Sequence, residues 1–297
     1  KKRKKKAHRK WRERKAHYGE MIQIDGSHHD WFEGRGIKCV LMAYIDDATG
    51  MVYARFCEYE GTLPALESFK GYIETYGLPL NIYTDRHTTY KSNGKSTIEQ
   101  ELTNSEPLSE FGRALKELGV NLIHANSPQA KGRIERFFGT FQDRGVKEMR
   151  LQGISDREQG NLFLESYLPV YNKRFAVEAR EEKNLHRELP DINLESILCI
   201  KTERALRNYF TVAHNKKLYQ IEEAVNTKKV VVEERIDGSL AITHKGRGLT
   251  YKEITLRPER QYQDKKQDKK PKIFKTRKRY IPSKDHPWRS FTFGKSI

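Results

Sequence analysis

Three acidic residues, far apart in the sequence, have the types and positions that metal-dependent phosphodiester chemistry requires. Asp25 and Asp85 each end an apolar stretch typical of a strand, and Glu135 falls in the first turns of a later helix. Active sites of open α/β sheets commonly lie at the ends of strands. If the two strands are neighbours, we expect the three carboxylates to converge.

Converging carboxylates form an oxygen-only site, the kind that binds Mg²⁺ or Mn²⁺. Two such ions, about 3.5–4 Å apart, activate the attacking hydroxyl and stabilise the leaving oxygen of a phosphodiester, so that no protein nucleophile is needed. A lone Asp at a strand end is more often a turn former or a helix cap. The prediction therefore rests on the combination of three acids on elements in this order.

Other polar residues near these acids compete for the same roles. Asp46 and Asp47 precede Ala-Thr-Gly at an expected hairpin, which favours a turn role for both. The adjacent histidines at 28–29 have no nearby Cys and make poor zinc ligands. His87 follows the second aspartate closely, and it fits either a contact to the scissile phosphate or a place in a surface loop.

Cationic residues surround Glu135 near the start of its helix. Side-chain cations and the free backbone N–H groups of a helix N-terminus both suit phosphate binding. An ordinary solvated helix face is the alternative. The residues that we expect to contact DNA here and near the second aspartate are Lys131, Arg133, Arg136, Gln129 and His87, with Ser127 as a further candidate.

A regular series of elements is predicted to position these residues. The expected strands cover 21–25, 37–46, 51–57, 80–84 and 121–125. The expected helices cover 62–76, 109–118, a long stretch after Ser127-Pro128, and 156–171, with Thr62 and Ser109 as caps. Three strands joined by short turns, then strands separated by helices, favour an antiparallel meander extended by parallel strands. Helices should cover both faces of this sheet.

The sequence changes character from about residue 199, where short strand-like runs alternate with turn residues. These runs are 209–213, 217–220, 229–234, 240–244 and 249–254. Such a pattern indicates a small β-barrel. The predicted organisation is a basic arm (1–18), a catalytic core (19–175), a linker (176–198), the small barrel (199–257) and a basic tail (258–297).

Charge is distributed very unevenly along the chain. Residues 1–17 hold 11 Lys/Arg and one acid, and residues 257–297 hold 14 Lys/Arg and four acids, so each end carries +10 of the total of +17. Basic ends of this kind bind polyanions by releasing counterions. Solvated disordered tails or a localisation signal are the alternatives, but aromatic residues within both ends favour contact with nucleic acid.

Cysteine usage and hydropathy exclude several classes of protein. The three cysteines form no CxxC pair, which argues against a structural zinc site and a disulfide framework and favours a reducing compartment. No apolar run has the length of a membrane span. Because the sequence opens on Lys1 rather than Met, we expect it to be part of a longer protein.

Four segments of the sequence resemble the DDE transposases of bacterial insertion sequences, which share a ribonuclease-H-like core with retroviral integrases. The string Ser-Pro-Gln-Ala-Lys-Gly-x-x-Glu within 124–142 is the most specific. The other segments are MIQIDGSHHDWF (21–32), YIDDATGMVYARF (44–56) and LNIYTDRHTTY (80–90). The barrel and the ending HPWRSFTFGK (286–295) resemble the C-terminal region of ISNCY-like transposases.

The resemblance implies that Asp25, Asp85 and Glu135 are the first, second and third metal ligands, with Mg²⁺ or Mn²⁺ as cofactor. It implies an α/β fold: a ribonuclease-H-like core with a mixed five-stranded sheet of order 3-2-1-4-5 and helices on both faces, followed by a small SH3-like β-barrel and a basic tail. The interval between Asp85 and Glu135 is wider than the family's commonest one. The polar stretch 91–108 accounts for the excess as an insertion.

The predicted function is DNA strand cleavage at the ends of a mobile element and strand transfer into target DNA. The expected partners are double-stranded DNA and further copies of the chain, as a homodimer or larger assembly, in the bacterial cytoplasm on the nucleoid. A ribonuclease-H-like nuclease or resolvase that only hydrolyses, and a catalytically inactive DNA-binding derivative, remain as alternatives.

Overall fold

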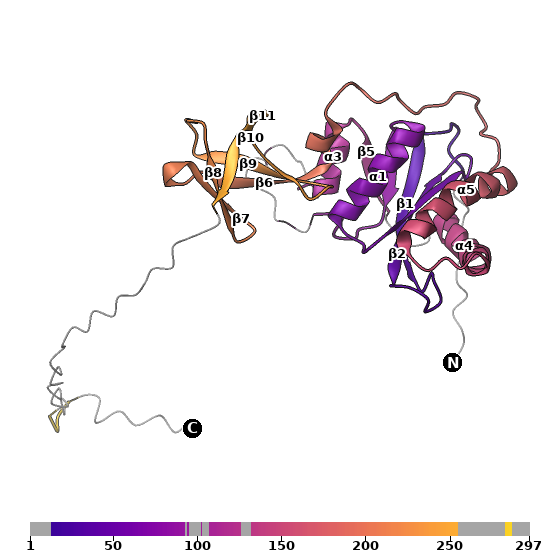
Figure 1. The fold of residues 1–297 in the computed structure, drawn as a ribbon, viewed down its shortest axis with the longest axis horizontal. Helices are drawn as coiled ribbons and strands as arrows, with labels where there is room; N and C mark the ends of the chain where they lie inside the picture. The colour runs from indigo at the N-terminus through magenta and orange to yellow at the C-terminus, as the bar shows by residue number, and fades with distance from the viewer. Residues whose placement is uncertain are drawn as a thin grey trace. The chain divides into compact units, whose positions relative to one another are not determined.

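A five-stranded mixed sheet organises the first half of the chain in the computed structural model (Figure 1). Its strands are β1 (Met21–His29), β2 (Cys39–Asp46), β3 (Val52–Cys57), β4 (Asn81–Thr84) and β5 (Asn121–His124). They lie in the order β3-β2-β1-β4-β5. Strands β1, β2 and β3 pair antiparallel, whereas β4 pairs parallel with both β1 and β5. The predicted strand order and the α/β fold class with a mixed five-stranded sheet are confirmed.

The structure describes residues 13–92, 94, 102, 107–125, 132–254 and 283–286. The chain divides into two compact units, 1–255 and 256–297, and only four residues of the second unit are described. The domain boundaries expected from the sequence stay a prediction. Within the described residues, no helix is both long and apolar enough to cross a membrane.

Helices cover both faces of the sheet, as predicted. On one face, α1 (Thr62–Tyr76) and α3 (Glu110–Glu117) bury apolar side chains against the strands, in what we call the α1–α3 core. On the other face, α4 (Gly132–Leu151) and α5 (Arg157–Phe175) form the α4–α5 core. Strand β2 is buried along its whole length because alternate residues point into each of the two cores.

The helix starts follow local chemistry, with one correction to the predicted caps. The Ser109 hydroxyl accepts a hydrogen bond from the Gly112 N–H and caps α3 as predicted. Thr62 does not cap α1: it is the first helical residue, and Gly61 is the cap residue without a side-chain hydrogen bond. Pro64 fits in that first turn because its missing N–H would have had no partner within the helix there.

A separate set of short strands follows residue 198, after the single turn α6 (Leu194–Ile197). The strands are β6 (Cys199–Ala205), β7 (Thr211–His214), β8 (Lys217–Ile221), β9 (Lys229–Arg235), β10 (Leu240–His244), β11 (Arg247–Leu249) and β12 (Tyr251–Ile254), and the 3-10 turn η2 (Asn208–Phe210) precedes β7. They form sheets of order β11-β10-β9-β6 and β12-β8-β7. Apolar side chains of both sheets share one core, as a small barrel requires; the SH3-like arrangement stays a prediction.

Two details of this region differ from the sequence-based expectation. Strand β6 was not predicted because its middle, Lys-Thr-Glu-Arg, is polar and shows no apolar alternation. Its extended conformation is stabilised by antiparallel pairing with β9. The predicted strand 249–254 is two strands, one in each sheet. The predicted insertion lies mostly outside the described residues, but Lys91 and Leu108 at its ends form an antiparallel bridge.

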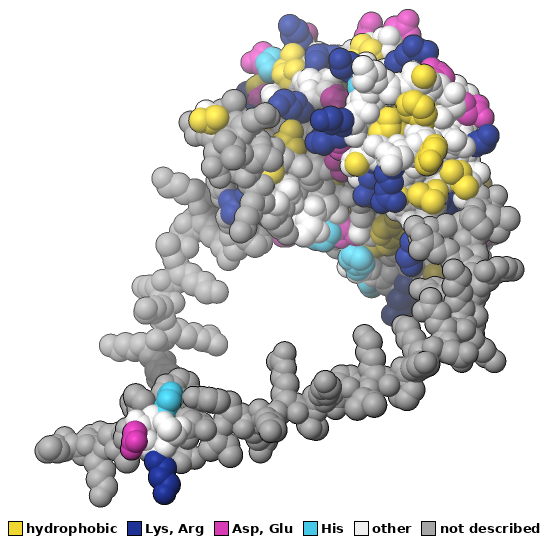
Figure 2. All heavy atoms as spheres, turned by 90° about the vertical axis from the view of Figure 1, so that its left-hand side faces the viewer, with side chains coloured by type: hydrophobic (Ala, Val, Ile, Leu, Met, Phe, Trp, Pro, Cys, Tyr) yellow, Lys and Arg dark blue, Asp and Glu magenta, His cyan; other side chains and the backbone are white. Residues whose placement is uncertain are grey.

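Charged side chains are mixed on the face of the molecule that Figure 2 shows. Lys and Arg lie there among acidic and apolar side chains, without one unbroken basic patch on its described part. This agrees with the sequence, in which residues 18–256 carry about −3 once the +10 at each end is subtracted from +17.

Candidate active site

Asp25 and Asp85 are placed side by side by the pairing of two parallel strands. Met21 pairs with Asn81 and Gln23 with Tyr83 in the β1–β4 ladder. Continued by two residues, this register puts the two aspartates level with each other on strands about 4.8 Å apart. Side chains at matched positions share a face of the sheet, so both carboxylates lie at the same edge of β1 and β4.

The buried Tyr90 hydroxyl gives independent evidence that acids converge here. Burial raises the pKa of Tyr90 well above its usual value, and nearby groups raise it further: Tyr44, then Glu60, Asp25 and Asp85. Three carboxylates therefore lie within electrostatic reach of one phenol. Its oxygen has no hydrogen-bond partner among the described residues.

The side chain of Asp25 points to the face of the sheet that α4 covers. Asp25 sits opposite Ala43 on β2, and opposite residues of an antiparallel pair share a face. Ala43 belongs to the α4–α5 core together with Ile134 of α4. The helix that carries Glu135 therefore packs on the same side of the sheet as the two aspartates.

A buried carboxylate fixes the start of α4 near this edge. Oδ1 of Asp47 accepts hydrogen bonds from Gln23 Nε2 at 2.7 Å and from Arg133 Nη1 at 2.5 Å. Its side chain is fully buried. Gln23 lies two residues before Asp25 on the same face of β1, about 6.7 Å along the strand. The first turn of α4 is thus held near the edge of the sheet at which Asp25 lies.

Glu135 lies two residues beyond this anchor, and its side chain is exposed. No group of three or more His, Cys, Asp or Glu side chains is arranged to hold a metal ion among the residues that the structure describes. The two aspartates nevertheless offer only oxygen ligands, which Mg²⁺ and Mn²⁺ prefer. The role of Glu135 as the third ligand stays a prediction.

Glu60, just before α1, is a fourth acid at this edge, and the sequence alone did not indicate it. Its Oε2 lies 3.1 Å from His28 Nε2, and its Oε1 lies 3.7 Å from His87 Nδ1. A Cβ on Gly26 would lie 3.0 Å from the Glu60 carboxyl carbon, so glycine beside Asp25 allows this close approach. No sequence signal separates Glu60 from other acids in polar turns.

The residues predicted to contact DNA have different surroundings. His87 is held close to Asp85, whose Oδ1 accepts the His87 backbone N–H at 2.9 Å. Arg136 is exposed on the first turns of α4. Arg133 is engaged with Asp47, a structural role that the sequence did not predict. Gln129, Lys131 and Ser127 lie outside the described residues. All of these DNA contacts stay predictions.

We expect Arg133→Ala to lower the free energy of unfolding by about 2–3 kcal/mol, because it removes the cation beside a buried carboxylate. This is less than the roughly 3–5 kcal/mol of a fully buried pair, since the Arg133 side chain is 20% exposed. The measurement is urea unfolding followed by circular dichroism. The exposed neighbour Arg136 is the control, and Arg136→Ala should change stability by about 0.5 kcal/mol or less. Equal stabilities of the two variants would contradict the anchoring role.

Comparison with curated proteins shows to which known proteins the chain is related. It is 37% identical over 248 residues to a Sinorhizobium fredii protein named transposase y4bF, covering 80% of this chain and 53% of that protein. It is 28% identical over 296 residues to the transposase for insertion sequence IS1202 of Streptococcus pneumoniae, covering 95% of this chain and 60% of that protein. The chain is homologous to insertion-sequence transposases. The resemblance found in the sequence is confirmed, and the chain spans little more than half the length of these relatives.

Comparisons with family models and with solved structures say less about what the chain is related to. No known family model matches the chain. Similar solved structures include a chain of the simian T-cell lymphotropic virus intasome in complex with PP2A regulatory subunit B56 gamma, at 15% identity, 77% coverage of both chains and a TM-score of 0.45. The HTLV-2 integrase catalytic core domain in complex with magnesium shares 18% identity over 51% of this chain and 84% of that chain, with a TM-score of 0.37. Likenesses this distant carry no further argument.

Proposed function

We propose that this chain is the catalytic part of a DNA transposase that cuts the ends of a mobile element and joins them to target DNA. One observation carries the proposal: β1 pairs parallel with β4 in a register that, continued by two residues, brings Asp25 level with Asp85. The helix that carries Glu135 is anchored on the same face of the sheet through Arg133 and Asp47. Homology to transposases supports the same conclusion.

The proposed site uses Asp25, Asp85 and Glu135 to hold Mg²⁺ or Mn²⁺, with two ions in each site. The donor set fits such ions because every side-chain donor is a carboxylate oxygen. When bound, the ions supply an activated hydroxyl and charge stabilisation at the leaving oxygen. The two strand aspartates give a fixed base for the site, and Glu135 completes it from the first turn of α4.

The histidines at the rim are proposed to orient the DNA. Nδ1 of His87 lies 3.1 Å from Thr89 Oγ1 and 3.4 Å from the Thr89 backbone nitrogen, which limits rotation of the ring. Nε2 of His28 lies 3.1 Å from Oε2 of Glu60, whose carboxyl group lies beside Gly26. Imidazole N–H groups held this way can donate to phosphate oxygens that flank the scissile bond.

The proposed partners are double-stranded DNA, as element ends and as target, and further copies of the chain in a dimer or larger assembly. Two ends of one element must be held together for joining, which requires more than one active site. We place this activity in the bacterial cytoplasm, on the nucleoid.

A strand-transfer assay tests the proposal. The full-length protein is incubated with Mg²⁺, labelled element-end DNA and a plasmid, and joined products are separated on a gel. Joined products that disappear with a chelator are the expected result. Cut ends without joined products would instead indicate a nuclease of the same fold. DNA binding without cutting would indicate an inactive derivative.

Glu60→Ala is expected to lower the rate of strand transfer about 10–100-fold, the usual effect of removing an outer partner of a metal site. The substitution releases His28 and His87 from their shared carboxylate. Glu60→Gln keeps an oxygen that can accept from His28, so it should retain more activity than the alanine variant. The control is Glu58→Ala, because the Glu58 side chain is 75% exposed. Equal rates for the Glu58 and Glu60 variants would remove the positioning role of Glu60.

A further inference from the structure

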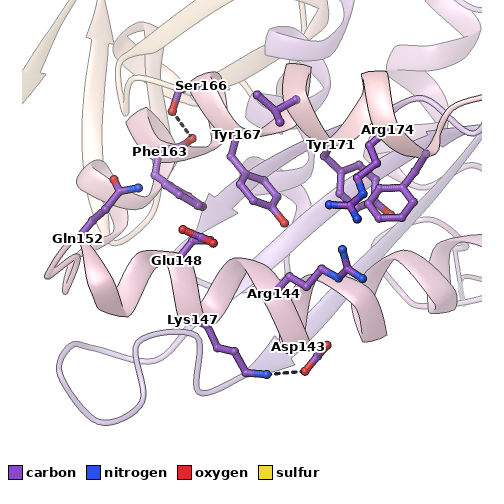
Figure 3. A pocket seen from close by; sticks show the side chains of 12 residues that line it. Asp143, Arg144, Lys147, Glu148, Gln152, Phe163, Ser166, Tyr167, Tyr171 and Arg174 are labelled. Atoms are coloured by element: carbon purple, nitrogen blue, oxygen red, sulfur yellow. Dashed lines mark hydrogen bonds and ion pairs between the residues drawn. The ribbon is translucent and has the colours of Figure 1, made fainter.

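A groove of about 590 Å³ runs between α4 and α5 (Figure 3), and none of the three proposed metal ligands is among its lining residues. Aromatic side chains of α5, among them Tyr167, Tyr171 and Phe175, line one side of it. Charged side chains of α4 line the other side, and Arg144 points across the groove toward Arg174. The groove therefore has an aromatic wall on one side and several charged side chains on the other.

Two arginines share one aromatic ring in this groove. The guanidinium carbon of Arg144 lies 5.5 Å from the centroid of the Phe175 ring, and that of Arg174 lies 5.6 Å from it. Cation–π contacts of this length hold a guanidinium in place. No ion pair to a carboxylate is found for either arginine in the part of the chain that the structure describes. Two like charges that are held on one ring and are not in an ion pair make a site that favours an anion.

The Tyr167 hydroxyl supplies a third donor. Burial raises the pKa of Tyr167, Glu148 raises it further, and Arg144 and Arg174 both lower it. Both guanidinium groups therefore lie within electrostatic reach of this oxygen. No hydrogen bond of the hydroxyl to another described residue is found, and Figure 3 shows it pointing into the groove.

The acids of the groove do not cancel the arginines. Asp143 is paired with Lys147 at 2.7 Å, so these two charges compensate each other. Glu148 is the one remaining carboxylate among the lining residues. Two guanidinium groups against one carboxylate leave the groove with a net positive charge.

The groove is on the opposite flank of α4 from the proposed active site. Arg144 follows Glu135 by nine residues, which is about 13.5 Å along a helix and about half a turn around it. The buried stripe of α4, with Ile134 and Phe141, lies between these two flanks. An anion bound by Arg144 is therefore not the scissile phosphate beside Glu135.

We propose that the α4–α5 groove binds the phosphate backbone of DNA outside the active site, through Arg144, Arg174 and the Tyr167 hydroxyl. Guanidinium groups bind phosphate oxygens in pairs of parallel hydrogen bonds, and a preset pair of arginines spans neighbouring phosphates. The proposal rests on the protein handling DNA, and it adds a second contact surface for the segments that strand transfer brings together.

The salt dependence of DNA binding tests this site. Affinity of the full-length protein for a labelled duplex is measured by fluorescence anisotropy across a range of NaCl concentrations. Each phosphate contact contributes about 0.9 to the slope of log affinity against log salt. Replacing both arginines (R144A with R174A) is expected to reduce the slope by about 1.8. Tyr167→Phe should weaken binding about fivefold and leave the slope unchanged, since it removes a neutral hydrogen bond.

A control double variant removes the same charge from the same two helices. Arg150 pairs with Glu33 at 3.3 Å and Arg157 with Glu58 at 3.6 Å, so neither is free for phosphate. R150A with R157A should keep the wild-type slope. Replacing both groove arginines with lysine separates loss of charge from loss of structure. This variant keeps both charges, so it should keep most of the wild-type slope if the fold is intact.

Three outcomes would overturn the groove site. They are an unchanged slope after loss of both arginines, an equal fall in the control variant, and a change in assembly mass without a change in slope. The last would mark the groove as a protein contact. Failure of the groove site can be distinguished from failure of the proposed function. If the salt slope depends on the two groove arginines but the protein carries out no strand transfer, the groove site stands and the proposed transposase activity does not.

Discussion

Asp85→Asn is expected to abolish strand cleavage and strand transfer while leaving DNA binding intact. The substitution removes one negative charge from the pair of acids that the β1–β4 register brings level with each other. A catalytic metal contributes several kcal/mol to transition-state stabilisation, and a loss of about 4 kcal/mol slows the reaction about a thousandfold. The measurement is the rate of cleavage of labelled element-end DNA at saturating Mg²⁺.

Binding and charge controls make this result specific. The asparagine variant should bind duplex DNA at least as tightly as the wild type, because a carboxylate that repels phosphate has gone. Glu158→Gln removes one acidic charge from an exposed position on α5 and should keep the wild-type rate. Cleavage at an undiminished rate by the Asp85 variant would remove the proposed site.

Trp31→Ala is expected to lower the free energy of unfolding by about 3–5 kcal/mol, the usual cost of emptying a large buried aromatic site. Trp31 is fully buried, and its ring centroid lies 5.9 Å from that of Phe56 and 5.6 Å from that of Phe141. Its Nε1 donates to the Ser27 carbonyl at 3.1 Å. The side chain therefore joins the strand that carries Asp25 to the helix that carries Glu135.

The lower free energy of unfolding of the Trp31→Ala variant should be seen in urea unfolding, and the rate of strand transfer should fall more sharply. Loss of this contact leaves α4 less well held over the sheet, so strand transfer should fall even at temperatures where the variant is folded. Trp31→Phe keeps most of the apolar volume and should recover at least half of the lost stability. Leu162→Ala is the control, because Leu162 is 65% exposed on α5. A Trp31→Ala variant as stable as this control would contradict the proposed contact between β1 and α4.

Local sequence pattern was sufficient to predict most elements of the five-stranded sheet and its helices. Alternating and continuous apolar runs gave the five strands, and the polar ends of two of them marked Asp25 and Asp85. Ser109 was identified as a cap from its position alone, because capping depends on a few adjacent residues. Strand β6 was missed for the corresponding reason: its charged residues give no local signal, and its partner β9 is distant in sequence.

Contacts between distant residues could not be predicted. Asp47 looked like a turn residue, yet its carboxylate joins Gln23 of β1 to Arg133 of α4. Glu60 approaches Gly26, the residue after Asp25, only because β1 and the segment before α1 meet there in the folded chain. Arg144 and Arg174, thirty positions apart, share the ring of Phe175 only once α4 and α5 pack together.

By itself, the sequence determined the elements, their order and the acids at their ends, because short-range periodicity and capping are written in neighbouring residues. Only the tertiary structure decided which charges are compensated and which stay available for a ligand. Whether a charged group is compensated depends on every other charged or polar group within a few ångströms of it. In this protein those groups come from strands and helices that are far apart along the chain.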